Sequence, residues 1–456
     1  MRRNSNSVSL KQQRIAELAK QSPQMGFTSL AYHMDIEWLH DAYRNTRKDG
    51  AAGVDGQTAA EYEQDFDGNL RRLLDRAKSG TYRAPPVRRA HIPKAGSDTE
   101  TRPIGIPTLE DKVLQRAVVM LLQPIYEAAF HDGSYGFRPG RSAHQALESL
   151  WKQSMDQHGG WILEVDIRKF FDTLDHARLR GFLQHRIRDG VLLRLIGKWL
   201  NAGVMEDGSV SYPEAGSPQG GVISPVLANI YLHYVLDSWF EQEVKPCLKG
   251  RAFLIRYADD FVIGFVREDD AKRVFDVLPK RFGKYGLTIH PDKTRLISFQ
   301  QPAERRVATG GEAGAPGNFD LLGFTHYWGR SRKGHWVVKR KTAKGRLSRA
   351  VRSIAEWCRF HRHLWVKHQH RTLCQKLRGH YAYYGITGNS SALSAFRTAV
   401  VRSWWKWLNC RNRERTMTWT VFGRLLANYP LAPARTVHSV YRHEANPCFE
   451  EPYALM

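Results

Sequence analysis

The chain has 456 residues, 42% of them hydrophobic, and carries a formal net charge of +24. The length exceeds one ordinary domain and predicts about two to four structural units, while the hydrophobic fraction excludes a disordered chain. So large a positive charge predicts a polyanionic partner, with nucleic acid as the leading candidate.

Cysteine usage and hydropathy exclude two further classes. The five cysteines are widely spaced and form no CxxC pair, which argues against a secreted disulfide framework. No apolar run reaches the roughly 20 residues that span a bilayer, and the N-terminus lacks a secretory signal. The sequence therefore predicts a soluble protein in a reducing compartment.

The first half of the chain changes pattern several times. Residues 1–25 are polar and predict a frayed end, and the stretch from Phe27 to Leu74 combines helical periodicity with a turn-forming AAGVDG segment at 51–56. A basic, proline-punctuated passage from Pro85 to Pro107 predicts a hairpin, and Leu109–Tyr126 has the apolar spacing of a helix. The central part, to about residue 328, mixes strand-like runs with helices, which is typical of an α+β domain.

Carboxylates stand at the ends of three strand-like runs. Trp161–Val165 is a short apolar run that Asp166 follows directly. Ala252–Arg256 and Phe261–Phe265 flank the acids of Tyr257–Asp260, which predicts a β-hairpin with carboxylates at its tip. Adjacent acids between apolar strands are costly unless cations neutralise them, and Mg²⁺ prefers oxygen ligands. An isolated Asp-Asp pair is more often a solvated turn, so neighbouring motifs must decide.

The positive charge is concentrated towards the C-terminus. Sixteen Lys or Arg lie between residues 330 and 380, against the single acid Glu356. A glycine-rich stretch at 310–317 predicts a surface loop, and we place a domain boundary near Gly329. From Leu347 onward the pattern is helical and rich in Trp. A solvated basic face is the alternative interpretation, but this density favours contact with phosphates.

The same region contains six potential zinc ligands. They are Cys358, His361, His363, His368, His370 and Cys374. Zinc sites usually show regular CxxC or HxxxH pairs, whereas these residues are scattered along an arginine-rich helical stretch. A basic surface facing RNA is therefore favoured over a zinc site.

A series of segments, taken in order, resembles the successive sequence blocks of reverse transcriptases. The blocks are His91–Lys94, Arg102–Pro107, Gly133–Ser142, the Asp166 segment, Gly216–Pro225, Tyr257–Asp260, Leu287–Thr294 and Leu321–Phe324. Ala52–Gly56 and Leu377–Gly385 with Gly388-Asn389 further resemble the enzymes of bacterial group II introns, the latter in their maturase region, domain X. The resemblance covers residues 27–440, and so many blocks in order make coincidence implausible.

The resemblance implies an α+β right-hand polymerase fold, with an antiparallel sheet in fingers and palm, followed by an all-α thumb and maturase domain. The implied boundaries are 1–87 for an N-terminal extension and the start of the fingers, 88–329 for fingers and palm, and 330–456 for thumb and domain X. The lack of Cys pairs near the end indicates the branch without an endonuclease.

The implied activity is RNA-directed DNA polymerisation. The enzyme would add dNTPs to a primer 3′-hydroxyl by phosphoryl transfer with two Mg²⁺ ions, for which Mn²⁺ can substitute, and would bind intron RNA and assist splicing. The implied partners are an RNA template, intron RNA, a DNA primer or target and dNTPs, without a membrane. The implied location is the bacterial cytoplasm, near the nucleoid.

The resemblance also assigns site residues. The metal site would comprise Asp166, Ile167, Asp259 and Asp260, and Lys293 would join the catalytic set as a proton donor to pyrophosphate. The nucleotide would be held by Lys94, Arg102, Phe171 and Gln219. Nucleic acid would contact Arg138, Arg141, Arg340, Lys341, Lys344, Arg346 and Arg378. Phe171 would exclude a 2′-hydroxyl; its alternative is an ordinary core aromatic. Solvated surface positions are the alternative for the cationic residues.

The other conspicuous side chains of the C-terminal region are assigned to structure. Trp404, Trp405 and Trp407 are expected to fill a helical core, and His380 and Tyr381 to have a structural role.

Other functions stay open. The same chemistry would serve a domesticated reverse transcriptase in phage defence, CRISPR adaptation or DNA repair. A second alternative is an RNA-binding splicing maturase without polymerase activity. An RNA-dependent RNA polymerase is a weaker candidate, because such enzymes more often carry Gly-Asp-Asp and lack a bulky residue at the place of Phe171.

Overall fold

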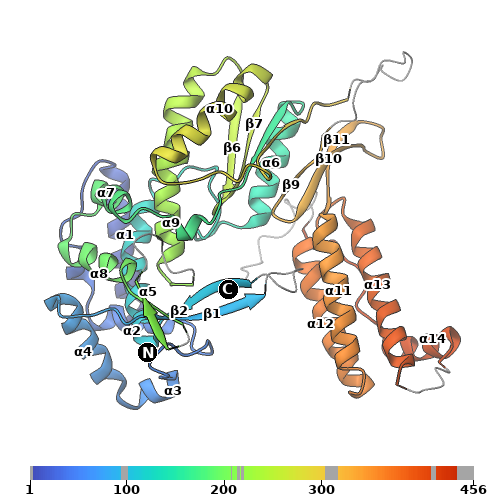
Figure 1. Ribbon diagram of the computed structural model, residues 1–456, viewed down its shortest axis with the longest axis horizontal. Helices are drawn as coiled ribbons and strands as arrows, with labels where there is room; N and C mark the ends of the chain where they lie inside the picture. Colours follow the sequence, from blue (N-terminus) through green and yellow to red (C-terminus); the bar gives the residue numbers. More distant parts are fainter. Residues whose placement is uncertain are drawn as a thin grey trace. The chain divides into compact units, whose positions relative to one another are not determined.

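The computed structural model describes residues 4–93, 101–206, 208–212, 216, 220–302, 317–411 and 417–438. It divides into two compact units (Figure 1). The N-terminal unit comprises mainly residues 1–146 and 163–296, and the C-terminal unit comprises residues 147–162 and 297–454. Both contain helices and strands, so the α+β prediction is confirmed. No helix in the described part of the chain is long and apolar enough to cross a membrane.

The N-terminal unit is built around one long buried helix, α5. Its helices are α1 (Asn4–Gln21), α2 (Ile36–Arg44), α3 (Ala59–Tyr62), α4 (Phe66–Ser79), α5 (Leu109–Glu127), α7 (His176–Arg186), α8 (Gly190–Leu200), α9 (Ser224–Leu232) and α10 (Glu268–Lys284), and α6 (Ala143–Asp156) begins in this unit. Thr108 caps α5 by accepting a hydrogen bond from Asp111 N, as the N-cap position favours. The Trp38 indole of α2 donates to the Ala117 carbonyl of α5 over 2.9 Å. The predicted helix at 109–126 is thus confirmed, whereas the expectation of a frayed segment over residues 1–25 is wrong, because α1 spans Asn4–Gln21.

A four-stranded sheet has the order β2-β1-β4-β5. Its strands are β1 (Val87–Pro93), β2 (Thr101–Ile106), β4 (Val204–Glu206) and β5 (Ser209–Ser211). β1 and β2 form the expected antiparallel hairpin, with Arg88 opposite Ile106, while β4 pairs with β1 in parallel.

A second four-stranded sheet has the order β6-β7-β3-β8. Its strands are β3 (Trp161–Val165), β6 (Ala252–Tyr257), β7 (Asp260–Phe265) and β8 (Arg295–Ser298). β6 and β7 are antiparallel and close at Tyr257 opposite Asp260, which confirms the predicted hairpin. Nearly every residue of the hairpin is buried, and α10 lies beside it (Figure 1), with the Phe282 ring 6.1 Å from that of Phe261.

The C-terminal unit joins a small sheet to a helical bundle. Its elements are β9 (Phe319–Leu321), β10 (Phe324–Arg330), β11 (Trp336–Thr342), α11 (Lys344–Phe360), α12 (Val366–Tyr384), α13 (Ser390–Asn409) and α14 (Trp419–Asn428). The helices share one core, in which Trp404 is completely buried and Trp405 and Trp407 pack against its edge. The assignment of these tryptophans to packing is confirmed.

The boundary between the units differs from the one expected near Gly329. Gly329 lies inside β10 and pairs with Val337 of β11, so a division there would cut a hairpin. The end of α6 belongs to the same unit, because the Trp151 indole donates to the Val338 carbonyl over 2.9 Å. Charge and glycine content therefore misplaced the boundary, and residues 336–342 are strand rather than helix. Residues 303–316, most of the predicted glycine-rich loop, lie outside the described part.

Short helical segments complete the description. The 3-10 segments are Leu30–His33, Glu63–Asp65, Phe170–Asp172 and Lys245–Cys247, and the π-helical segments are His233–Asp237 and Phe240–Val244. π-helical turns are rare and often occur at functional sites. His233–Asp237 directly follows α9 and reaches beneath the β6–β7 hairpin.

Candidate active site

Two carboxylates from distant parts of the chain lie near each other at the end of strands β3 and β6 in the second sheet. Asp166 follows the last residue of β3, and Asp259 lies in the turn between β6 and β7. Burial raises the pKa of Asp259, and the Asp166 carboxylate raises it further, while the Arg102 and Arg256 guanidiniums lower it. Asp260, at the start of β7, is exposed. The fold therefore brings Asp166 within electrostatic reach of the turn.

Lys293 also reaches this end of the strands. Its Nζ donates to Asp166 Oδ2 over 3.1 Å. The backbone aligns the two segments, because His290 N donates to the Asp166 carbonyl over 2.8 Å and Ile167 forms a bridge with Ile289. The side chain of Ile167 carries no polar atom, so only its backbone carbonyl could serve as a metal ligand.

The donor set fits magnesium better than a metal with an all-protein shell. In the described ranges, no three His, Cys, Asp or Glu side chains gather closely enough to enclose a metal ion. Magnesium typically takes one or two carboxylates and completes its shell with water and substrate phosphates. A divalent cation beside Asp259 would favour the ionised form of this carboxyl and so oppose the raised pKa.

The segment of residues 216–223 is described at its two ends, and the first end, Gly216, is fixed beside Phe171. Gly216 N donates to the Leu174 carbonyl over 2.9 Å, and His176 Nε2 donates to the Gly216 carbonyl over 2.5 Å. Phe171 itself is half-buried in the 3-10 segment that precedes Leu174. Gly216 thus lies next to Phe171, the residue expected to exclude a 2′-hydroxyl.

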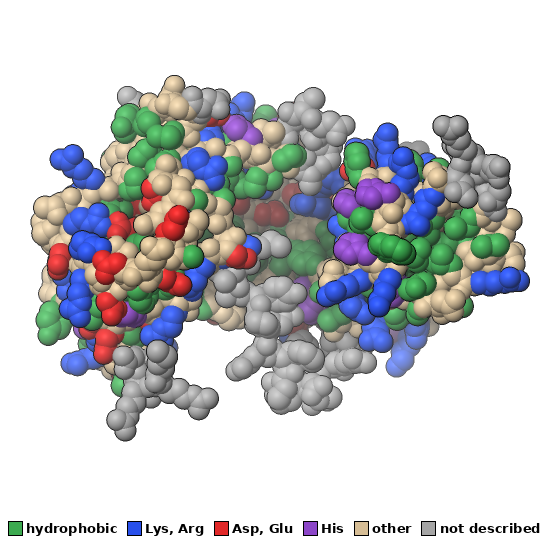
Figure 2. Space-filling model, turned by 90° about the horizontal axis from the view of Figure 1, so that it is seen from below, with side chains coloured by type: hydrophobic (Ala, Val, Ile, Leu, Met, Phe, Trp, Pro, Cys, Tyr) green, Lys and Arg blue, Asp and Glu red, His purple; other side chains and the backbone are tan. Residues whose placement is uncertain are grey.

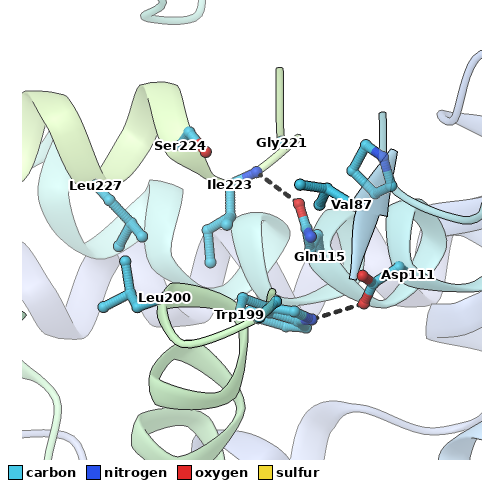
Figure 3. Close-up of a pocket in the computed structure, with 11 residues that line it drawn as sticks. Val87, Asp111, Gln115, Trp199, Leu200, Gly221, Ile223, Ser224 and Leu227 are labelled. Atoms are coloured by element: carbon cyan, nitrogen blue, oxygen red, sulfur yellow. Dashed lines mark hydrogen bonds between the residues drawn. The ribbon is translucent and has the colours of Figure 1, made fainter. Parts of the chain in front are cut away.

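The second end of this segment is fixed against β2 and α5. Gly220 has φ +118°, and a Cβ there would lie 2.6 Å from the Gly105 carbonyl of β2, so only glycine fits. Ile223 N donates to Gln115 Oε1 over 3.3 Å (Figure 3). β2 also carries the exposed Arg102. Gln219 and Lys94, the other expected nucleotide ligands, lie outside the described residues.

Beneath this second end is a small pocket that the sequence did not reveal. Figure 3 shows Gln115, Asp111, Trp199 and Ile223 around it. The Trp199 indole donates to Asp111 Oδ1 over 2.7 Å, and the Tyr82 hydroxyl donates to the same oxygen. Gln115 and His176 stand in none of the sequence blocks, and no sequence signal distinguishes them from ordinary helix residues.

Two of the arginines expected to contact nucleic acid are buried. Arg138 forms an ion pair with Glu127 at 2.9 Å and donates to the His131 and Ser134 carbonyls over 2.7 Å. Arg340 is also buried, on β11 opposite His326. The structure therefore speaks against a nucleic-acid contact at these two positions. Arg141 is partly exposed and pairs with Asp132 at 2.7 Å.

The remaining expected positions lie on the surface of the C-terminal unit. Lys341, Lys344, Arg346 and Arg378 are exposed. Figure 2 shows many Lys, Arg and His side chains with hydrophobic groups on the part of the surface formed by the helical bundle, whereas Lys and Arg alternate with Asp and Glu on the other unit.

The turn between α11 and α12 adds aromatic groups to this basic surface. Phe360 is 68% exposed and Trp365 is 86% exposed, and Arg362 and His363 between them are exposed as well. The buried Gln369 side chain holds the turn by donating to the carbonyls of residues 361, 362 and 364 over 2.8 to 3.1 Å. Aromatic and cationic groups on a fixed turn are the combination that binds unpaired bases.

The six potential zinc ligands do not form a metal site. Cys358 and Cys374 are buried in the core of the bundle, and the Cys374 sulfur is 3.4 Å from His370 Nε2. His361 Nδ1 contacts the Trp357 carbonyl at 2.9 Å. No third ligand joins Cys374 and His370 in the part of the chain that the structure describes.

The domain X motif packs inside the bundle. His380 stacks on Phe396 with ring centroids 3.9 Å apart, and burial lowers its pKa to about 4, so it is neutral at physiological pH. Tyr381 is buried in the same core. Asn389 donates to the Thr342 hydroxyl and the Tyr384 carbonyl, both over 2.8 Å, and accepts from Thr342 N, which links β11 to α12 and α13. These contacts match the structural role expected of His380 and Tyr381.

Comparison with known proteins adds independent findings. Residues 92–326 match the family described as reverse transcriptase (RNA-dependent DNA polymerase). The chain is 35% identical over 290 residues to Protein YkfC of Escherichia coli, covering 56% of this chain and 75% of that protein. It is 38% identical over 227 residues to the group II intron-encoded protein LtrA of Lactococcus lactis, covering 48% of this chain and 37% of LtrA. Nuclear intron maturase 3 of Arabidopsis thaliana is 25% identical over 224 residues, 42% of this chain and 31% of that protein.

Proposed function

Because the chain belongs to the reverse transcriptase family, with group II intron proteins among its relatives, we propose that it extends a primer 3′-hydroxyl with dNTPs on an RNA template. The observation that carries this proposal is that Asp166, at the end of β3, lies near enough to Asp259, in the turn between β6 and β7, for its carboxylate to raise the pKa of Asp259. Such a pair at the ends of strands is what two-metal phosphoryl transfer requires.

Each residue at the site receives a role in this proposal. Asp166 and Asp259 would hold two divalent cations, Mg²⁺ or Mn²⁺, with Asp260 and the Ile167 carbonyl as supporting ligands. The bound ions would lower the pKa of the 3′-hydroxyl and stabilise the leaving oxygen. Lys293, which donates to Asp166 Oδ2, would give a proton to the departing pyrophosphate.

The nucleotide would lie between β2 and the loop of residues 216–223. Arg102 would neutralise its phosphates, together with Lys94. Phe171 would exclude a 2′-hydroxyl, and Gln219 would contact the base or sugar. The backbone hydrogen bonds of Gly216 and Ile223 favour this role, because anchored ends reduce the conformational freedom that a ligand must restrict.

We assign the N-terminal unit to fingers and palm and the C-terminal unit to thumb and domain X. The exposed cations Lys341, Lys344, Arg346 and Arg378 would contact the backbone of template duplex or intron RNA, with Arg141 on the other unit. The turn with Phe360 and Trp365 would stack on unpaired bases. Assistance to splicing would rest on this surface.

Primer extension tests the proposal. The wild-type chain, an RNA template with a DNA primer, dNTPs and Mg²⁺ should give extended products, and Asp259→Asn should reduce the rate by about three orders of magnitude or more. Asp276→Asn, an exposed acid on α10, is the matched control and should keep full activity. Absence of extension by the wild type, with RNA binding intact, would instead favour a maturase without polymerase activity.

A further inference from the structure

The turn that carries Asp259 rests on a single buried arginine. Arg256 is the penultimate residue of β6 and is completely buried. Its Nε and Nη2 donate to the two carboxylate oxygens of Asp237 over 2.8 and 2.6 Å. Nη1 donates to Asn229 Oδ1 over 2.9 Å and to the Ala258 carbonyl over 3.0 Å, and Nη2 also donates to the Ser134 hydroxyl over 2.7 Å. A guanidinium has five N–H donors, and these five contacts use them all.

One of these contacts holds a strained residue of the turn itself. Ala258 has φ +57°, a left-handed conformation that residues other than glycine seldom adopt. Such a conformation persists only where the surroundings determine it. The carbonyl bound by Arg256 belongs to this residue, which directly precedes Asp259.

The segment of residues 133–136 holds the turn from the other side. Arg256 N donates to the Gly133 carbonyl, and Tyr135 N donates to the Arg256 carbonyl, both over 2.8 Å. A Cβ at Gly136 would lie 2.2 Å from Ala258 N, so the backbone there requires glycine. Asn229 donates to the Gly136 carbonyl over 2.6 Å and so ties this segment to the arginine network.

We propose that Arg256 and Asp237 are positioning residues, which fix the turn so that the Asp259 carboxylate is oriented for metal binding before substrate arrives. Neither side chain is placed to touch substrate, because both are buried. The charges of Arg256 and Asp237 neutralise each other. The other N–H groups of Arg256 donate to acceptors that are themselves fixed in the fold. This inference rests on the proposed polymerase function, since it names what orients the catalytic acid.

Replacing Arg256 with lysine tests whether its hydrogen-bond geometry, and not only its charge, orients the turn that carries Asp259. Arg256→Lys keeps the positive charge but offers only three donors and no planar fork, so the network cannot be completed. Buried groups that orient metal ligands typically contribute 10- to 100-fold to metal affinity or activity. We expect Arg256→Lys to weaken Mn²⁺ binding by about tenfold and to lower kcat by about 10- to 100-fold, with the KM for dNTP changed less than about threefold.

The experiment is an Mn²⁺ titration followed by electron paramagnetic resonance, with primer–template bound, beside steady-state primer extension. Arg186→Lys is the matched control, because Arg186 is also buried in the N-terminal unit and donates to the Met25 and Ala19 carbonyls. The control should leave Mn²⁺ affinity unchanged. Unchanged Mn²⁺ affinity and kcat in a folded Arg256→Lys protein would overturn the inference.

Two further comparisons keep the inference testable if Arg256→Lys does not fold or if the wild type does not extend primers. If Arg256→Lys does not fold, Ser134→Ala removes one acceptor, and Mn²⁺ affinity equal to that of the wild type would then overturn the inference. If the wild type binds Mn²⁺ without extending primers, the proposed function fails, while a loss of Mn²⁺ binding on substitution still supports the positioning role.

Discussion

The two units each fix an important turn with one buried polar side chain, but the two side chains differ in charge. In the N-terminal unit, the cation Arg256 supports a turn that carries carboxylates. In the C-terminal unit, the neutral Gln369 supports the turn between α11 and α12, which is surrounded by arginine and histidine. The buried group beneath the acidic turn is thus a cation that complements the charge of the turn. The basic turn has a buried neutral amide beneath it, and the exposed Arg411 also donates to its carbonyls at residues 362 and 364.

Arg256 and Gln369 also differ in the property of the protein that depends on them. Arg256 contacts the left-handed Ala258 next to Asp259, the proposed catalytic acid, so a substitution there should be measured as lost activity. Gln369 accepts from the Trp404 indole over 2.8 Å and closes a turn over the bundle core, so an error there would be measured as lost stability. Substitutions at the two turns should separate these effects.

The largest effect on primer extension is expected at Gly136, which contacts the turn that carries Asp259. Gly136→Ala would place a Cβ against Ala258 N and push the turn away from its position, so primer extension should fall by about 100-fold or more. Gly181→Ala is the control, because nothing lies within 4 Å of a Cβ there. Equal extension rates for the Gly136 variant and the wild type would show that the close contact is not needed.

The next effect tests the neutral support. Gln369→Leu would leave the buried Trp404 indole without its acceptor and remove three hydrogen bonds to the turn, of whose carbonyls two also accept from Arg411, so urea unfolding should show a loss of about 2–3 kcal/mol. Gln375→Leu makes the same change at an exposed position of the same helix and should alter stability by less than about 0.5 kcal/mol. A similar result for both variants would remove Gln369 from the comparison.

A third comparison concerns Asp111, a buried acid that forms no ion pair with the described residues. Burial raises the pKa of Asp111 to about 6 from an ordinary 3.8, whereas Asp237 has Arg256 beside it. The folded protein therefore binds this proton more tightly than the unfolded chain, and the stabilisation is complete below pH 3.8 and lost as the pH rises to 6. The pKa difference corresponds to a change on the order of 3 kcal/mol.

Asp111→Asn removes this titration while keeping the shape of the side chain. The free energy of unfolding of the wild type minus that of the variant should be larger at pH 4 than at pH 7 by about 2–3 kcal/mol. The same difference for Asp276→Asn should change far less over this range. A pH-independent difference for Asp111→Asn would contradict the raised pKa.

The smallest effect concerns the exposed face of the basic turn. Trp365→Ala should weaken binding of single-stranded RNA by about 5- to 100-fold at fixed salt, because stacking contributes about 1–3 kcal/mol per base. Stability should not change, since the side chain is 86% exposed. Tyr32→Ala, an aromatic 81% exposed on the other unit, is the control in a fluorescence anisotropy titration. Equal affinities for both variants would exclude stacking at Trp365.

The sequence predicted those parts of the site that follow from local pattern. Short apolar runs ending in Asp166 and enclosing Asp259 predict strands with acids at their ends, and the structure has these strands. The order of the blocks then predicted the family, which the comparisons show. Local patterns could not show that Asp166 and Asp259 interact, because their separation in the chain is bridged only by the packed sheet.

The sequence could not predict which charged side chains are buried or which distant residues they contact. Arg138 and Arg340 look like their exposed neighbours, because composition records charge but not whether a carboxylate such as Glu127 lies beside it. Asp237 sits in an apolar helical stretch, and its pairing with Arg256 depends on a π-helical turn that no periodicity predicts. The unit boundary was misplaced for a related reason, since the strands packed on α6 are distant from it in sequence.

The most direct test of the central claim is to locate the metal ions. A crystal of the protein with primer–template, a non-hydrolysable dNTP and Mn²⁺ should give anomalous density between the Asp166 and Asp259 carboxylates, and Asp259→Asn should lose it. Manganese bound elsewhere, with neither carboxylate in contact with an ion, would contradict the assignment of these two acids to catalysis.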